Sequence, residues 1–275
     1  MIKNLLSLHA LTLLAVTCLC PSQTGAHGDV HESIMRMSQE IENQPDLPAL
    51  RMERAGLFSQ HGEFEKALKD LAKVSALEPG NDFARALRGE IFRRTGKLAE
   101  AREEQEAFLK KHPQHAQVRW EYCRTLADTG DAAPALRELD ALIGAAEHPS
   151  PDAVALRLKL TEAIGKEEAL RWLNSFLEKH PLPVFQEHAL RLESAVGRTV
   201  EAVKRLDLMI SSAARKETLF LRKAAILHDV GDKAGAAAAA LSAQECMVKL
   251  PTHLRGTPAT TALMQQVEKI LSSSK

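Results

Sequence analysis

The sequence predicts an all-α protein built as a linear array of helical hairpins, and two observations carry this prediction. Hydrophobic residues make up 45% of the 275 residues and aromatic residues only 4%, so alanine and leucine supply the apolar surface and favour helix over strand. A pattern of glycine, alanine and leucine also returns about every 34 residues, a period typical of stacked helix pairs.

Six glycines mark the turns of this repeat, with spacings of 34, 34, 35, 32 and 34 residues. An alanine follows each turn four or five residues later, and a small or apolar residue precedes most turns by seven. Apolar residues at helical spacing run for about a dozen positions on either side of each glycine, as in two helices joined by a short turn. The expected turn glycines are Gly62, Gly96, Gly130, Gly165, Gly197 and Gly231.

Each residue type at these positions has a structural reason. Glycine ends the first helix because it adopts the left-handed conformation of a tight exit without steric cost. The alanine and the small residue let the two helices approach closely, while leucines and phenylalanines three and four positions apart fill the space between them. One hairpin cannot bury its apolar face alone, so we expect consecutive hairpins to stack.

The pattern resembles tetratricopeptide repeats, in which a small residue, an aromatic residue, glycine, alanine and proline recur over 34 residues. The first two repeats match best, with Phe64, Ala67 and Pro79 in the expected places of the first, and the later four match more loosely. The resemblance implies a right-handed superhelix of six αα-hairpins, and an irregular helical bundle is the alternative. The expected repeats span residues 48–250, divided as 48–81, 82–115, 116–149, 150–182, 183–216 and 217–250.

Helical patterns also flank the repeats, as capped solenoids require. Within residues 27–47 we expect an N-terminal capping helix over 29–43, whose apolar positions are Val30, Ile34, Met37 and Ile41. Within residues 251–275 we expect a C-terminal capping helix over 258–271, whose inward positions are Leu263, Val267 and Ile270.

Residues 1–26 have the pattern of a secretory signal peptide. An apolar stretch runs from Leu5 to Leu19, and small residues up to Ala26 suit cleavage before His27. The stretch is short for a membrane span, which needs about 20 apolar residues, and an uncleaved anchor is the alternative. We therefore expect an exported protein, periplasmic or secreted, with no integral membrane segment in the mature chain.

The charge balance argues against a nucleic-acid partner, and the cysteine spacing argues against a C-x-x-C site. The chain has 36 basic and 36 acidic residues, so its net charge is zero and we expect no nucleic-acid partner. Cleavage of the signal would remove Cys18 and Cys20. The remaining Cys123 and Cys246 lie far apart and form no C-x-x-C pair, so we expect both to be buried free thiols.

None of the short motifs that carry catalysis or cofactor binding is present. The sequence has no glycine-rich phosphate loop, no G-x-S-x-G elbow, no H-E-x-x-H helix and no calcium loop. Its acidic residues are interspersed with lysine and arginine on helices, which predicts a solvated face. We therefore expect a scaffold with no enzymatic activity and no cofactor. The resemblance implies protein or peptide partners, and an enzyme that uses the repeats as a frame is the less favoured class.

A binding groove is expected on the first helices of the hairpins. In tetratricopeptide-repeat proteins these helices line the concave face, and residues six and three before the turn glycine tend to point inward. Applied to this chain, the rule predicts that Glu90, Arg93, Arg124 and Arg191 line the groove. Arg94 lies beside Arg93 and Trp120 one turn before Arg124, so we expect both in the same groove. Arginine with tryptophan is typical of binding hot spots, and guanidinium groups suit carboxylates. The alternative is that the arginines pair within the chain, with Glu90, Glu121 or Asp128.

Metal handling is the alternative function, because the chain has eleven histidines. Cleavage after Ala26 would let the α-amine and imidazole of His27 chelate copper or zinc, with His31 nearby on the first turn of the lead helix. Two histidines are an incomplete ligand set, which favours an ordinary structural role. Three histidines precede prolines near expected helix ends, where an imidazole suits the helix dipole, namely His112, His148 and His180.

Overall fold

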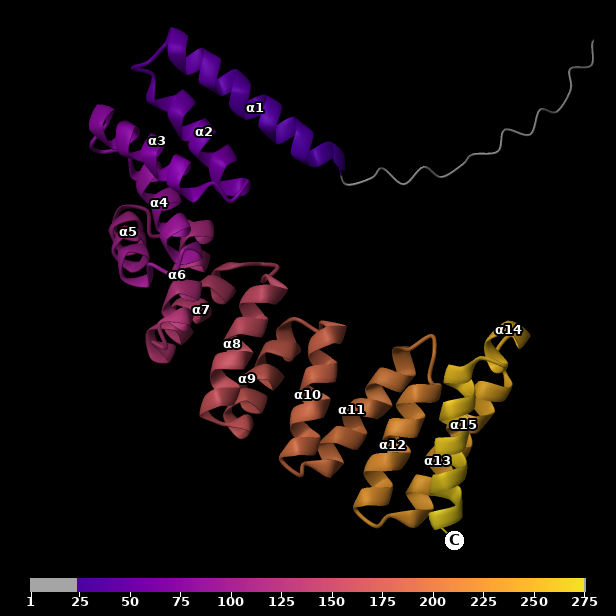
Figure 1. Ribbon diagram of the computed structural model, residues 1–275. Helices are drawn as coiled ribbons and strands as arrows, with labels where there is room; N and C mark the ends of the chain where they lie inside the picture. The colour runs from indigo at the N-terminus through magenta and orange to yellow at the C-terminus, as the bar shows by residue number, and fades with distance from the viewer. Residues whose placement is uncertain (1–23, 275) are drawn as a thin grey trace, which may run out of the picture. The chain divides into compact units, whose positions relative to one another are not determined.

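The structure is a computed structural model that describes residues 24–274 (Figure 1). These residues form fifteen helices and no strand, which confirms the all-α hairpin prediction. The chain divides into two compact units, residues 1–129 and 130–275, here called the N-terminal unit and the C-terminal unit and described separately. The division falls between the two helices of the expected repeat 116–149.

The N-terminal unit is a run of six helices in which each helix packs against the next along the chain (Figure 1). Its core is formed where the amphipathic faces meet, at Ile34, Ala55, Phe58, Leu71, Val74 and Ile91. The helices are α1 (Thr24–Asn43), α2 (Pro48–Gln60), α3 (Phe64–Leu77), α4 (Asp82–Arg94), α5 (Leu98–Lys111) and α6 (Ala116–Asp128).

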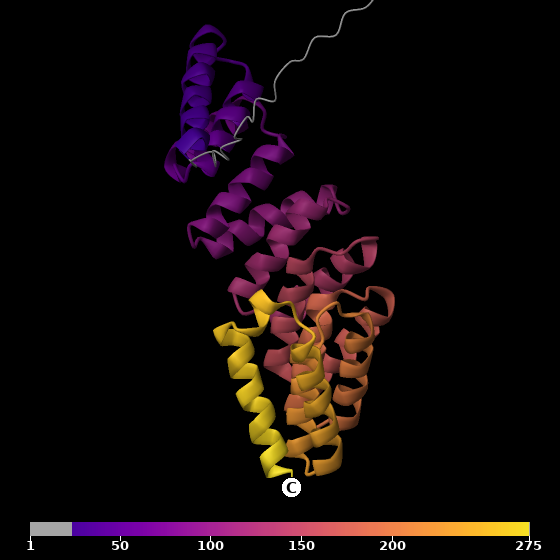
Figure 2. The same cartoon turned by 90° about the vertical axis from the view of Figure 1, so that its right-hand side faces the viewer.

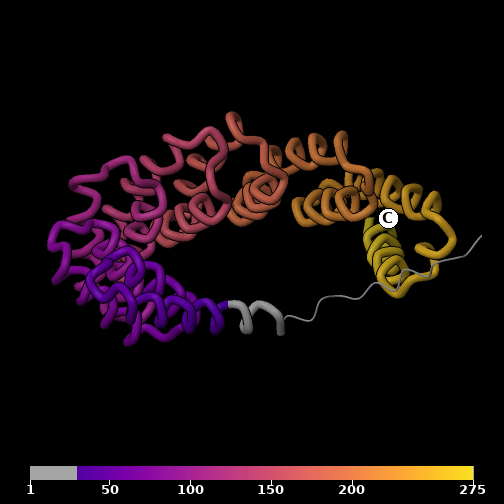
Figure 3. The backbone as a smooth tube through the Cα atoms, turned by 90° about the horizontal axis from the view of Figure 1, so that it is seen from above, coloured from indigo at the N-terminus to yellow at the C-terminus, as the bar shows by residue number. Residues whose placement is uncertain are grey.

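The C-terminal unit continues the same construction with nine helices. Figure 2 shows the last helix lying beside the end of this array, and Figure 3 looks along the helices. The helices are α7 (Ala132–Ala145), α8 (Pro151–Ile164), α9 (Lys166–Lys179), α10 (Pro183–Ala195), α11 (Thr199–Ser212), α12 (Glu217–Asp229), α13 (Lys233–Val248), α14 (Thr252–Arg255) and α15 (Pro258–Ser273).

The hairpin turns use glycine as expected at five of the six positions. There φ lies between 73° and 82°, in the left-handed region that other residues enter only at a cost. Gly165 contradicts the expectation, because its φ of −179° is ordinary extended backbone. The reason is the length of the connection: Gly165 alone joins α8 to α9, so the chain reverses without the left-handed exit of the longer turns.

Close approach of paired helices follows the small residues. The alanine after each turn is fully buried, from Ala67 in the first hairpin to Ala236 in the last. At Gly89 on α4 an added Cβ would lie 3.1 Å from Cγ of Gln105 on α5, so glycine permits this packing distance. The small residues of the repeat pattern therefore mark the positions where paired helices pack most closely.

Glu193 breaks the apolar pattern and is compensated by a buried ion pair. It lies at a position where other repeats carry phenylalanine or leucine, and it is 1% exposed. Arg205 of α11 donates to both of its carboxylate oxygens, at 2.9 and 2.6 Å, and also to Oδ1 of Asn174 on α9. A buried carboxylate is tolerated when it is paired and hydrogen-bonded in this way.

Both flanking helices are present, with boundaries that differ from expectation. α1 begins at Thr24, five residues before the expected start, so the proposed cleavage point after Ala26 falls within it. At the other end, α15 buries Val267 against α12 and α13, and the four-residue α14 precedes it without a sequence signal. The apolar stretch of the expected signal peptide lies outside the described residues. Within 24–274, no helix has the length and hydropathy to cross a membrane.

The two cysteines in the described part of the chain lie in different units and form no disulfide. Cys123 is buried on α6, as expected. Cys246 on α13 is only half-buried, so the expectation of a fully buried side chain was wrong for this residue.

Candidate partner-binding surface

In the N-terminal unit, Arg93 of α4 is held by carboxylates of α6. Its Nε donates to Oε2 of Glu121 at 2.9 Å, and its Nη1 donates to Oδ2 of Asp128 at 3.2 Å. The side chain of Arg93 is only 11% exposed. This arginine therefore joins two successive first helices, which is the pairing alternative that the sequence had left open.

Arg94 also acts within the chain. Its Nη1 donates to the backbone carbonyl of Ser59 on α2 at 3.0 Å, and its guanidinium lies 4.7 Å from the ring centroid of Phe64 on α3. The carboxylate of Glu90 is 3.7 Å from the same guanidinium. These contacts connect α4 to the preceding hairpin and leave Arg94 little freedom to meet a partner.

The remaining expected residues of this unit lie on α4 and α6. Arg124 donates to Oε1 of Glu121 at 3.1 Å, and its guanidinium is 5.8 Å from the ring of Trp120. Burial, followed by the negative charge of Glu121, raises the pKa of the Glu90 carboxyl, and the nearby arginines oppose this shift. The cluster has equal numbers of arginines and carboxylates, and most of its charge is compensated internally.

The C-terminal unit repeats the same register of contacts with the charges reversed. In the N-terminal unit, the residue three before one turn glycine, Arg93, meets the residue nine before the next, Glu121. In the C-terminal unit the corresponding residues are Glu162 of α8 and His188 of α10, which form an ion pair when the imidazole is protonated. Arg191 donates through Nη2 to the same Glu162 carboxylate at 3.4 Å.

Arg191 is the expected site residue that stays accessible, with its side chain 62% exposed. Its described contacts use Nη2 alone, on Glu162 and on the ring of His188, so within residues 24–274 Nε and Nη1 have no partner. A guanidinium carries five donors in a planar fork that matches a carboxylate. Arg191 can therefore bind the carboxylate of a partner through Nε and Nη1 without losing its own contact with Glu162.

Two hollows flank this arginine on successive first helices. The α8–α10 hollow has a volume of about 260 Å³ and the α10–α12 hollow about 520 Å³, and both are lined by His188 and Arg191. Arg222 of α12 borders the second hollow and is paired with Glu187 of α10. We call this surface the first-helix face; its charged residues are Lys159, Glu162, Glu187, His188, Arg191 and Arg222.

The histidines do not form a metal site in the part of the chain that the structure describes, where no three potential ligands come together. His31 is exposed. It does not lie in the first turn of the helix as expected, because α1 begins seven residues earlier, at Thr24. The side chain of His27 lies outside the described residues. His112 and His180 occupy the C-cap positions of α5 and α9, as expected, while His148 lies beyond the cap of α7.

Sequence reasoning missed two partly buried ion pairs that recur with the repeat. Arg54 of α2 donates to both oxygens of Asp70 on α3 at 2.7 Å, and 34 residues later Arg88 of α4 donates to Glu104 on α5 at 2.7 Å. The signal was available, because both arginines and both acids are spaced by one repeat. These pairs lie inside hairpins and position the helices, so they are not candidates for partner binding.

Comparison with solved structures identifies the fold. The C-terminal part of a TPR repeat-containing protein from Cytophaga hutchinsonii matches with a TM-score of 0.62 at 13% identity, over 87% of this chain and 96% of that one. A tetratricopeptide repeat protein from Parabacteroides merdae matches with a TM-score of 0.51 at 15% identity, over 89% and 94%. The described part of the chain therefore has the fold of tetratricopeptide-repeat proteins.

Two further proteins are similar to parts of this chain. YrrB, described as a TPR protein with an unusual peptide-binding site, matches with a TM-score of 0.50 at 19% identity, over 64% of this chain and 91% of that one. Among curated proteins, DnaJ homolog subfamily C member 3 of Mus musculus is 32% identical over 88 residues. That match spans 32% of this chain and only 18% of the mouse protein. No family model matches the chain.

Proposed function

We propose that the protein is a non-catalytic scaffold that binds a peptide or protein partner on the first-helix face of its C-terminal unit. The observation that carries the proposal is the pair of adjoining hollows that share His188 and Arg191. Three successive first helices, α8, α10 and α12, contribute to them, so an extended segment can cross several repeats. A peptide-binding protein of the same fold supports this assignment.

The chemistry of the face favours an acidic segment. Lys159, Arg191 and Arg222 carry permanent positive charge, against two carboxylates, and His188 adds a further positive charge when it is protonated. Because the Arg222 charge is already matched by Glu187, the accessible guanidinium of Arg191 is the main anchor. We expect it to form a charge-assisted, bidentate hydrogen bond with a partner carboxylate.

Export belongs to the same proposal and rests on the sequence of residues 1–26. N-terminal sequencing of protein recovered outside the cytoplasm tests it, since an exported, processed chain begins near residue 27. A chain that retains its first residues and stays in the cytoplasm would contradict export, without affecting the proposal for the binding face.

Selection from a random dodecapeptide library displayed on phage tests the binding proposal. We expect enriched peptides rich in aspartate or glutamate, whose affinity falls by about tenfold or more in Arg191→Ala, as for a hot-spot arginine. Lys204→Ala is the matched control, because Lys204 is an exposed cation of α11 outside both hollows. Fluorescence anisotropy with labelled peptides provides the affinities. Failure to enrich any peptide, or equal loss in both variants, would contradict the proposal.

A further inference from the structure

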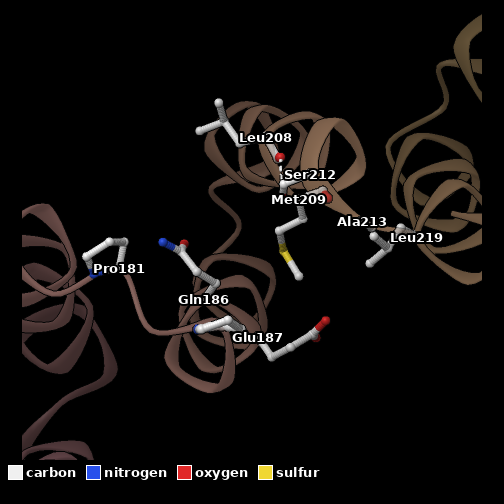
Figure 4. A pocket seen from close by; sticks show the side chains of 9 residues that line it. Pro181, Gln186, Glu187, Leu208, Met209, Ser212, Ala213 and Leu219 are labelled. Carbon is white, nitrogen blue, oxygen red and sulfur yellow. Dashed lines mark hydrogen bonds between the residues drawn. The ribbon is translucent and has the colours of Figure 1, made fainter. Parts of the chain in front are cut away.

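An apolar cavity lies next to the first-helix face, where the N-terminal ends of α10 and α12 meet the C-terminal end of α11. Its volume is about 470 Å³, within the range of about 300–1,000 Å³ that ligand pockets occupy. Figure 4 shows Gln186 and Glu187 on one side and Leu208, Met209 and Ser212 on the other. Leu219 and the proline-containing loop before α10 complete the wall.

The apolar lining of this cavity is open to solvent. Leu208 is 72% exposed although it is a large hydrophobic residue of α11, whereas Leu219 is buried. Exposed apolar surface beside a concavity costs free energy, and a bound apolar group would recover it by removing that surface from water. The cavity is therefore suited to a bulky aliphatic or aromatic side chain.

Glu187 connects the apolar cavity to the α10–α12 hollow, because it lines both. Its carboxylate is paired with Arg222, so it does not present an uncompensated negative charge to an approaching acidic group. Arg191 lines the same hollow one turn further along α10. One short segment that follows α10 would therefore meet a cationic subsite and an apolar subsite in succession.

We infer that the partner of the first-helix face carries a bipartite motif, a carboxylate that binds Arg191 and a bulky apolar side chain that fills the apolar cavity. This inference rests on the proposed function and adds the second half of the motif. The occupant is a segment of another protein, argued from the charge of the face and the continuity of the two subsites through Glu187. The apolar side chain supplies affinity through burial, and the carboxylate fixes direction and register.

A set of defined peptides tests the motif. The probes are fluorescein-labelled peptides Asp-(Gly-Ser spacer)-Leu with spacers of different length, and matched peptides in which Asn replaces Asp or Ser replaces Leu. At the best spacing we expect the Asp/Leu probe to bind about tenfold or more tightly than either matched probe, as loss of one well-buried side chain predicts. Anisotropy titration of the full chain gives the affinities.

Two variants of α11 assign the apolar preference to the cavity. Leu208→Asp places a carboxylate on the cavity wall at an exposed position, so folding should be unaffected, and we expect the preference for Leu over Ser to disappear while the preference for Asp over Asn remains. Val200→Asp is the matched control, because Val200 is 64% exposed on the same helix and does not line the cavity. It should bind as the unmodified chain does.

The outcomes separate this inference from the proposed function. An acidic preference without an apolar preference, or an apolar preference that survives Leu208→Asp, would overturn the bipartite motif and leave the first-helix face as the binding site. Equal binding of all probes, together with library peptides insensitive to Arg191→Ala, would overturn both. Self-association measured by sedimentation and abolished by Leu208→Asp would mean that a second copy of the chain occupies the cavity, and would overturn the motif.

Discussion

Gln105 stands at a core position where neighbouring repeats have leucine, and both polar atoms of its amide are buried without a hydrogen-bond partner among the described residues. A buried polar group without a partner costs about 1–3 kcal/mol. We therefore predict that Gln105→Leu raises the free energy of unfolding by about 1–3 kcal/mol, as measured by urea denaturation. A destabilised variant would mean that the amide has partners or that the branched side chain does not fit beside Gly89.

Glu90 gives a prediction that depends on pH. Burial and the charge of Glu121 raise the pKa of its carboxyl in the folded state, so the folded state binds the proton more tightly than the unfolded state. Stability then falls as the pH rises from the ordinary glutamate pKa of about 4.3 through the raised value. Above the raised pKa, Glu90 is charged in both states, and the free energy of unfolding no longer falls because of this group.

We predict that Glu90→Gln is more stable than the unmodified chain at pH 7, by less than about 1 kcal/mol because solvent screens a half-exposed group. The difference should vanish below about pH 4, where the glutamate is protonated in both states. Denaturation midpoints of the two proteins from pH 3.5 to 8 provide the comparison. A stability difference of the opposite sign at pH 7 would show that the arginine contacts of Glu90 outweigh its burial.

At the scale of the helix and the turn, Gly165 and Gly197 offer a matched pair in the C-terminal unit. At both positions an added Cβ meets no atom within 4 Å, but only Gly197 has a left-handed φ, of 73°. We predict that Gly197→Ala lowers the free energy of unfolding by about 1–2 kcal/mol, while Gly165→Ala leaves it unchanged or raises it by about 0.4–1 kcal/mol. Equal effects of the two substitutions on the denaturation of the full chain would refute the distinction.

The contrast between these glycines shows what the sequence can and cannot predict about the elements. The repeat pattern predicts helix pairs because glycine, alanine and the apolar positions each report a local requirement. The pattern did not predict the extended backbone of Gly165. This connection is shorter than the others, but the turn residue is still glycine, so its residue type does not reveal the different backbone conformation. The four-residue α14 was also missed, because so short a helix has no periodicity to detect.

The binding residues were less predictable than the helices. A position in the repeat indicates where a side chain points, but it does not indicate whether a neighbouring carboxylate pairs with its charge. Arg93 and Arg191 both fit the inward positions of first helices. The structure shows that Arg93 is enclosed by two carboxylates, whereas the only carboxylate near Arg191 among the described residues is that of Glu162, at 3.4 Å from Nη2, which also contacts the ring of His188. The apolar cavity combines residues from α10, α11, α12 and a loop, so no single sequence motif marks it.

At the scale of the whole molecule, the repeat continues through the boundary between the two units. Gly130 has the same left-handed φ as the other long turns, so the sequence gives no signal that α6 and α7 belong to different units. The exposed chemistry nevertheless differs between the units. The arginine cluster of α4 and α6 is largely paired internally, while the first-helix face of the C-terminal unit offers an accessible guanidinium beside open hollows.

Hydrogen–deuterium exchange of the full chain, with and without a library-selected peptide, tests the assignment of the binding face most directly. Bound peptide should lower the local opening of the helices that it contacts, so their amides should exchange more slowly. The account predicts slower exchange in α8, α10 and α12, and no change in α9 and α13. Slower exchange confined to the N-terminal unit, or to α9 and α13, would contradict it.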